Sequence, residues 1–138
     1  MSVGRICVRE IDLAAAEESA LVAGRRMAER QVGTLIVLDE AKRPIGLITD
    51  RDLVLRVLVA GKDPQNTRVG DIMTRDPKIV SEESAIEAAL ALMRAGSFRR
   101  LPVVSRGGEL VGILSLDDVL TLLAEEFAHI GGVVERRK

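Results

Sequence analysis

A hydroxyl and a carboxylate recur at the same spacing in two places of the chain. Thr49 and Asp52 follow the apolar run 46–48, and Ser115 and Asp118 follow a similar run 66 residues later. Each pair stands where a predicted strand ends and a helix begins. The carboxylate can accept from both hydroxyls of a ribose, while the hydroxyl and the helix N-terminus can hold phosphate oxygens. The alternative is that these side chains act only as helix caps.

Two arginines stand directly before the apolar run 101–104. Arg99 and Arg100 can form bidentate hydrogen bonds to a phosphate group, which lysine cannot do. At the corresponding place, 66 residues earlier, the chain has the uncharged Gly33 and Thr34. The alternative for the arginines is a solvated pair without a ligand. Arg51 has the same two interpretations, because it can reach a phosphate or only be solvated.

The remaining reactive residues do not form a catalytic set. Cys7 is the single cysteine, so an internal disulfide is impossible, and a buried or bystander thiol is the simpler interpretation. His129, the single histidine, falls on the last predicted helix. The sequence has no Ser/His/Asp set, no Walker lysine loop and no cluster of metal ligands. Catalysis and metal binding are therefore not expected.

Composition narrows the class of protein further. The chain has 138 residues, 47% of them hydrophobic and 30% charged, which is typical of one globular module. A net charge of -1 and only two aromatic residues, Phe98 and Phe127, make nucleic-acid binding unlikely. No apolar run approaches the roughly 20 residues of a membrane helix, and the chain has no pattern of a secretory signal. We therefore expect a cytoplasmic protein.

The elements that position these residues also repeat at the 66-residue offset. Apolar periodicity predicts helices over about 17–30 and from Ser84, a predicted cap with Glu87 as its capping-box partner, to Gly96. Each is followed by two short buried strands, 34–38 with 45–49 and 101–104 with 110–115. Ile79 and Val80 form the first strand of the second copy. In the first copy this strand is poorly defined, and Ile6 and Val8 are its candidates.

The last helix of each copy is apolar on nearly all sides, over 53–59 and over 119–127. One sheet cannot cover so much apolar surface, so burial against a second subunit is expected. Residues 61–67 have the composition of a linker. The predicted repeats are therefore 1–66 and 67–138, which together form one compact module.

In its motifs the sequence resembles a cystathionine-β-synthase (CBS) domain pair, also called a Bateman module. The matching segments are Asp71–Pro77, Arg100–Val104, Gly46–Asp52 and Gly112–Asp118, in the order and spacing of that family. The first copy departs from the family at Gly33–Val37, where the second has Arg-Arg-Leu-Pro-Val.

The resemblance implies an α/β fold of two βαββα units packed with pseudo-twofold symmetry and with two clefts between them. It further implies a regulatory ligand such as AMP, ADP, ATP or S-adenosylmethionine, and a protein partner in trans. Adenine would contact an apolar slot near the start of each sheet, which is formed here by Val32 and Thr34 or by Phe98, Arg100 and Val80. The arginine pair would then face the nucleotide held by Asp52. The Asp118 cleft would bind weakly, bind an uncharged-tail adenosyl compound, or stay empty.

Overall fold

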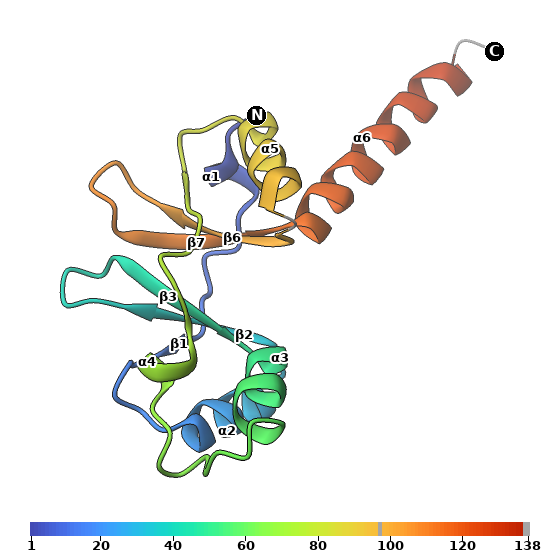
Figure 1. Cartoon of the computed structure of the whole chain (residues 1–138). Coiled ribbons are helices and arrows are strands. Elements are labelled where there is room, and N and C mark those ends of the chain that lie inside the picture. The colour runs from blue at the N-terminus through green and yellow to red at the C-terminus, as the bar shows by residue number, and fades with distance from the viewer. Residues whose placement is uncertain (97, 137–138) are drawn as a thin grey trace.

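The computed structural model describes residues 1–96 and 98–136. The chain folds into two halves, each with a small sheet covered by helices, and the two sheets face each other across the middle of the molecule (Figure 1). This is the mixed α/β tandem repeat that the sequence predicts.

The first half has a four-stranded sheet in the order β1-β2-β3-β4. Its elements are β1 (Leu13–Ala14), α2 (Ala20–Arg30), β2 (Thr34–Leu38), β3 (Pro44–Thr49), α3 (Asp50–Leu53), the π-helix η1 (Val54–Leu58) and β4 (Thr74–Arg75). Strand β1 pairs with β2 in parallel, whereas β2, β3 and β4 pair antiparallel.

The second half repeats this arrangement with the sheet β5-β6-β7. Its elements are β5 (Val80–Ser81), α5 (Ile86–Gly96), β6 (Arg100–Val104), β7 (Leu110–Ser115) and α6 (Leu116–Arg136). The register of β6 against β7 copies that of β2 against β3, since Arg100 lies opposite Ser115 as Thr34 lies opposite Thr49. The repeat in sequence is therefore also a repeat in hydrogen bonding.

Each half receives a short helix from the chain segment that precedes the other half. Helix α1 (Val3–Ile6) packs on the second half, where the Val3 N–H donates to the Ser84 carbonyl over 2.8 Å. Helix α4 (Val69–Ile72) packs on the first half, where the Val69 N–H donates to the Glu18 carbonyl over 2.8 Å. This exchange joins the two halves into one module.

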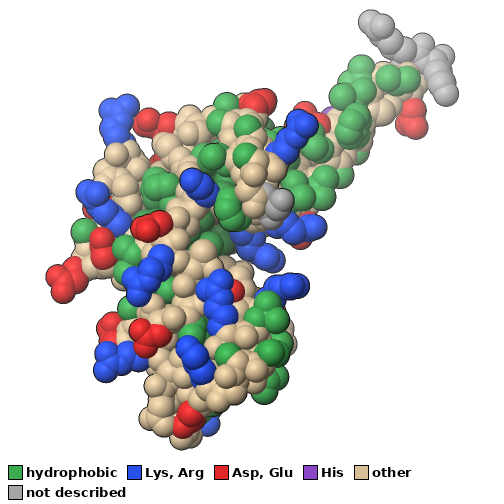
Figure 2. Space-filling model, in the orientation of Figure 1, with side chains coloured by type: hydrophobic (Ala, Val, Ile, Leu, Met, Phe, Trp, Pro, Cys, Tyr) green, Lys and Arg blue, Asp and Glu red, His purple; other side chains and the backbone are tan. Residues whose placement is uncertain are grey.

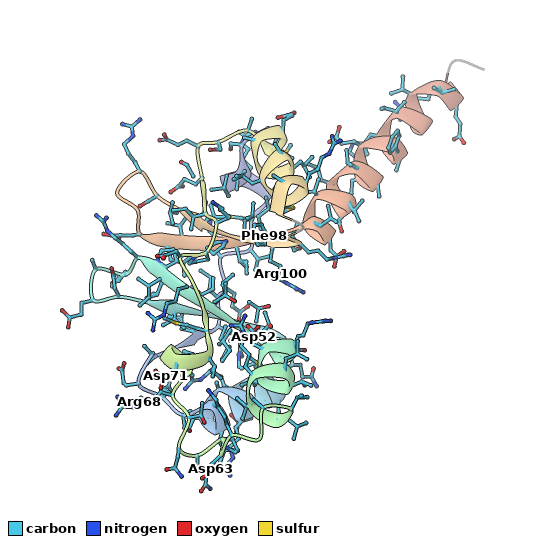
Figure 3. The ribbon with its side chains drawn as sticks, in the orientation of Figure 1. Asp52, Asp63, Arg68, Asp71, Phe98 and Arg100 are labelled. Carbon is cyan, nitrogen blue, oxygen red and sulfur yellow. The ribbon has the colours of Figure 1, made fainter. Side chains whose placement is uncertain are left out.

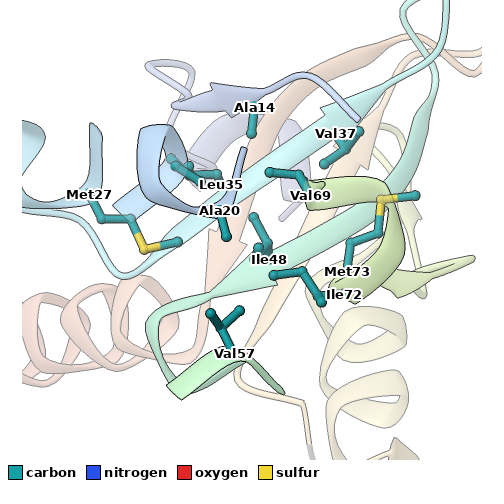
Figure 4. Close-up of a cluster of buried hydrophobic side chains, with 11 residues drawn as sticks. Ala14, Ala20, Met27, Leu35, Val37, Ile48, Val57, Val69, Ile72 and Met73 are labelled. Atoms are coloured by element: carbon teal, nitrogen blue, oxygen red, sulfur yellow. The ribbon is translucent and has the colours of Figure 1, made fainter. Parts of the chain in front are cut away.

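Two separate hydrophobic cores result, one for each half. The first surrounds fully buried Leu35, Val37 and Ile48 and includes Val69 and Ile72 from the exchanged helix (Figure 4). The second contains, among others, Val3, Val80, Ala89, Leu101, Val103, Leu114 and Val119. Each buried sheet face is thus covered by its own helices and by one exchanged helix.

Three predicted elements differ from the structure. The segment with Ile6 is helical, and the first strand of the first half is β1, because the exchange places α1 on the opposite half. Helix α2 begins after Ser19, whose Oγ accepts from the Val22 N–H, so it starts later than predicted. Helix α5 begins at Ile86, which leaves Ala85 before its first turn and makes the predicted cap at Ser84 wrong.

Helix α6 contains His129, as the sequence predicts, and continues beyond the apolar stretch 119–127 to Arg136. It projects away from both halves (Figure 1). In the part of the chain that the structure describes, no helix is long and apolar enough to cross a membrane.

Candidate functional site

A cleft of about 320 Å³ lies where the two halves meet. The N-terminal segment, the start of β2 and the β7–α6 junction all contribute to its wall. The lining residues are Val8, Glu10, Ile11, Asp12, Gln31, Val32, Gly33, Thr34, Ile36, Arg100, Ile113, Ser115 and Asp118. The structure therefore brings five of the predicted binding residues of the two halves into one cavity, namely Val32, Thr34, Arg100, Ser115 and Asp118.

At the β7–α6 junction, Ser115 and Asp118 form a reciprocal pair. The Asp118 N–H donates to Ser115 Oγ over 3.1 Å, and the Ser115 N–H donates to Asp118 Oδ2 over 3.0 Å. This capping box satisfies two backbone donors and fixes the orientation of the carboxylate. In residues 1–96 and 98–136, the other oxygen, Oδ1, has no hydrogen-bond partner. It can accept hydrogen bonds from a ligand without disturbing the cap.

The β3–α3 junction of the first half has the same geometry. The Asp52 N–H donates to Thr49 Oγ1 over 3.1 Å, and the Thr49 N–H donates to Asp52 Oδ2 over 2.9 Å. Here, however, Arg56 Nε lies 3.7 Å from Asp52 Oδ1. The position equivalent to Arg56 in the second half is Leu122. The second carboxylate oxygen is thus paired at the Asp52 site and unpaired at the Asp118 site.

The two arginines of the predicted pair have different positions. Arg100 lines the Asp118 cleft, and in Figure 3 its side chain extends from β6 into the space between the halves. Arg99 lies 3.8 Å from Asp117, with 70% of its side chain exposed. The Asp118 cleft, which the sequence predicts to lack this charge, is therefore lined by Arg100, and the role of the pair at the Asp52 cleft stays a prediction. Arg100 stands opposite Ser115 across the β6–β7 ladder, which places both side chains on one face of the sheet.

The residues expected to contact adenine also separate. Val32 and Thr34 line the Asp118 cleft. Val80 is 4% exposed and belongs to the core of the second half. Phe98 and Arg51 are both exposed, and neither lines this cleft. Val80 is therefore a core residue, and the predicted adenine contacts that line the cavity are Val32, Thr34 and Arg100.

Sequence reasoning missed the N-terminal wall of the cleft. Glu10 and Asp12 line it, and both accept hydrogen bonds from Arg30, over 2.9 Å and 2.8 Å. Hydrogen bonds to Asp12 and then to Glu10 raise the pKa of the Arg30 guanidinium. No sequence motif marks this segment. It reaches the cleft only because α1 crosses to the second half and the chain must return to β1.

Cys7, on the edge of the second core, is half-buried, and burial raises the pKa of its thiol above the usual range. Its Sγ lies in contact distance of the position that a Cβ on Gly112 would take. Across the described ranges 1–96 and 98–136, no group of three His, Cys, Asp or Glu side chains is placed to hold a metal ion.

Comparison with known proteins agrees with this geometry. The CBS domain model matches residues 3–59 and 69–125. The uncharacterised protein MK0525 of Methanopyrus kandleri is 35% identical over 120 residues, which cover 87% of this chain and 61% of that protein. The Arabidopsis thaliana protein CBSCBSPB2 is 39% identical over 96 residues, which cover 70% of this chain and 18% of that protein. The chain thus spans less than two thirds of the length of these relatives.

Solved structures of similar proteins share the fold. A CBS-domain protein from Burkholderia ambifaria superposes with a TM-score of 0.79 at 29% identity, covering 89% of this chain and 93% of that one. The structure of CBSX2 in complex with AMP superposes with a TM-score of 0.77 at 29% identity, covering 90% of this chain and 96% of that one. The chain belongs to the CBS-domain family and carries two copies of the domain.

Proposed function

We propose that the protein is a regulatory module that binds an adenine nucleotide in the Asp118 cleft. The observation that carries the proposal is the unpaired Oδ1 of a carboxylate that a capping box holds in place, in one cavity with Arg100. The ribose hydroxyls would donate to Asp118, the phosphate would contact Arg100, and the adenine would lie against Val32 and Thr34. The complex of the similar protein CBSX2 with AMP supports a ligand of this class.

The charges of the cleft favour a monophosphate over a triphosphate. Arg100 is the single Lys or Arg in the described wall, whereas Glu10, Asp12 and Asp118 are acidic. One guanidinium can form a bidentate pair with one phosphate group. Further phosphates would approach Glu10 and Asp12, and the Arg30 guanidinium beside them is already paired with these two carboxylates. AMP is therefore the ligand that we propose among AMP, ADP and ATP.

The two clefts are unequal in this proposal, in the direction opposite to the one that the sequence suggests. At the Asp52 site, Arg56 Nε lies 3.7 Å from the carboxylate oxygen that a ribose would use, and its Nη1 donates to the Ile72 carbonyl over 2.7 Å. A ligand there must displace the guanidinium or share the carboxylate with it. We therefore propose that the Asp52 cleft binds the nucleotide more weakly than the Asp118 cleft. Its contacts there would come from Thr49, Arg51, Phe98 and Arg99.

The proposed role is signalling to a protein partner in trans, not catalysis. The Burkholderia relative is described as a signal-transduction protein, and the relatives compared above are CBS-domain proteins. The sequence contains no motif that identifies this partner.

Thermal unfolding with AMP, ADP, ATP, adenosine, NAD and S-adenosylmethionine tests the proposal. At one common concentration, the compound with the lowest dissociation constant stabilises the folded state most, by about 2.7 kcal/mol at 100 times that constant. The expected result is therefore the largest upward shift of the unfolding midpoint with AMP. A larger shift of the unfolding midpoint with S-adenosylmethionine or NAD would identify that compound, and not AMP, as the ligand of the cleft. No shift with any compound would favour the alternative function, a structural dimerisation module with empty clefts.

We propose in addition that the protein forms a homodimer through its apolar helices. Large apolar side chains of η1 and the turn after it remain exposed in the single chain, namely Val54, Leu55, Leu58 and Val59. An exposed apolar surface of this kind is typical of a protein contact. Light scattering at micromolar concentration tests this proposal, and a monomer would contradict it.

A further inference from the structure

Helix α6 carries a seven-residue repeat of apolar side chains. Along it, spacings of four and three residues alternate through Leu116, Leu120, Leu123, Phe127, Ile130 and Val134. This is the 3.5-residue period of the a and d positions of a coiled coil, sustained over nearly three heptads. A helix that only covers a globular core would follow a period of 3.6 and would not continue beyond that core.

Most of this stripe is exposed on the single chain. Leu116 packs beside the second core, whereas the five following stripe residues are 45% to 70% exposed. Figure 2 shows hydrophobic side chains along the projecting helix. The surface therefore stays open to water unless another molecule covers it.

The outer part of α6 is also poorly suited to stand alone. It lies beyond residue 125, where the match to the CBS domain ends. Gly131 and Gly132 lie within it, and no other atom lies within 4 Å of the positions that their Cβ atoms would take. Glycine destabilises a helix interior, and a helix without tertiary contacts is marginal in water. Its apolar stripe needs a partner surface.

We infer that α6 pairs with α6 of a second copy of this chain as a two-stranded coiled coil. All residues of the stripe are apolar, so the stripes of two copies can pack against each other. The stripe has no polar residue of the kind that specifies a different partner in a coiled coil. Of the positions that flank it between residues 119 and 133, only Glu126 is charged, so like-charge repulsion across the pair is small. The small flanking residues Ala124 and Gly131 permit close approach of the two backbones. This inference rests on the proposed dimer and assigns its contact to α6.

A matched pair of variants tests the coiled coil. Ile130→Glu places a charge on the stripe, whereas His129→Glu places the same charge about 100° around the helix, on its outer face. Sedimentation equilibrium of the full chain should give a dimer for the wild type and for His129→Glu. For Ile130→Glu the dimer dissociation constant should rise at least tenfold. Both substitutions lie outside the two cores, so neither should unfold the module. Ile130→Glu should lower only the helical circular dichroism that comes from the outer part of α6, because the lost pairing leaves that part marginal, and His129→Glu should leave the spectrum unchanged.

The outcomes separate the two proposals. A monomeric wild type overturns both the dimer and the coiled coil. A dimer that Ile130→Glu leaves as tight as the wild type overturns the coiled coil and leaves the dimer through η1 in place.

A second measurement tests the pairing of α6 with α6 directly. Residue 125 is the midpoint of the stripe, so it lies near its counterpart in both a parallel and an antiparallel pair. In a Cys7→Ser background, spin labels at Glu125→Cys should be about 20–35 Å apart, as expected for two adjacent helices of about 10–12 Å diameter with label arms. A separation above about 50 Å would overturn the inference.

Discussion

Replacing Arg100 with alanine removes the single guanidinium from the described wall of the Asp118 cleft. In residues 1–96 and 98–136 no carboxylate lies within ion-pair distance of Arg100, so its side chain is available to a ligand. The variant should keep the fold, because the Arg100 side chain is exposed and its backbone pairing with β7 does not depend on the side chain.

The size of the effect follows from the exposure of the contact. A hydrogen bond to a charged group contributes about 1.5–3 kcal/mol when it is well shielded. Arg100 is exposed, so screening by solvent reduces the expected loss to about 1–2 kcal/mol. This corresponds to AMP binding that is about 5- to 30-fold weaker.

Isothermal titration calorimetry with AMP and with adenosine separates the phosphate contact from the base and ribose contacts. Adenosine affinity should change less than about twofold, and the dependence of AMP affinity on salt should become flatter. Arg99→Ala is the matched control, because Arg99 lies beside Asp117 and outside the cleft wall. An equal loss for adenosine and AMP, or the same loss in Arg99→Ala, would refute the assignment of Arg100.

Three further substitutions test other parts of the account. Arg56→Leu introduces the residue found at the equivalent position of the second half and removes the ion pair with Asp52. Adenosine binding at the weaker cleft, measured by calorimetry, should become about 2- to 5-fold tighter, which corresponds to one exposed ion pair, and unchanged binding would contradict the role of Arg56. In a denaturant titration, Gly112→Ala should lower the free energy of unfolding by about 1–3 kcal/mol, because the new Cβ would lie 2.9 Å from the Val8 carbonyl oxygen. Gly46→Ala should lower it less, because the new Cβ would meet the flexible side chain of Met73. Glu18→Gln should destabilise the protein by about 1 kcal/mol at pH 7, because hydrogen bonds from Arg26 lower the pKa of Glu18 in the folded state. This stabilisation is present above the unfolded-state pKa and is lost as the pH falls through the folded-state pKa, so a stability difference between the two proteins that does not shrink on acidification would refute it.

The sequence predicts the repeated elements because their signals are local. The two hydroxyl–carboxylate pairs cap helices, which is one of the two interpretations that the sequence offers, and the paired strands occupy 34–38 and 44–49 as the apolar runs indicate. Each of these features depends on residues within a few positions of one another, so its spacing alone is informative.

The assignment of the arginine pair to a cleft could not be made in the same way. It depends on how two distant segments meet, and the exchange of α1 and α4 between the halves has no local signal in two four-residue helices. The exchange brings Glu10 and Asp12 to the cleft wall that Arg100 also lines. The ion pair between Arg56 and Asp52 was, by contrast, accessible from the i, i+4 spacing together with the leucine at the equivalent position.

The most direct test of the account compares AMP binding to Asp118→Asn and Asp52→Asn by calorimetry. Asparagine keeps an amide oxygen that accepts from the backbone N–H of each capping box. It replaces the second carboxylate oxygen with an NH2 group, which removes the charge and the acceptor for the ribose hydroxyls. We predict one strong AMP site per chain, weakened about 10- to 100-fold by Asp118→Asn and less than about twofold by Asp52→Asn. Loss of AMP binding in Asp52→Asn with full binding in Asp118→Asn would contradict the account.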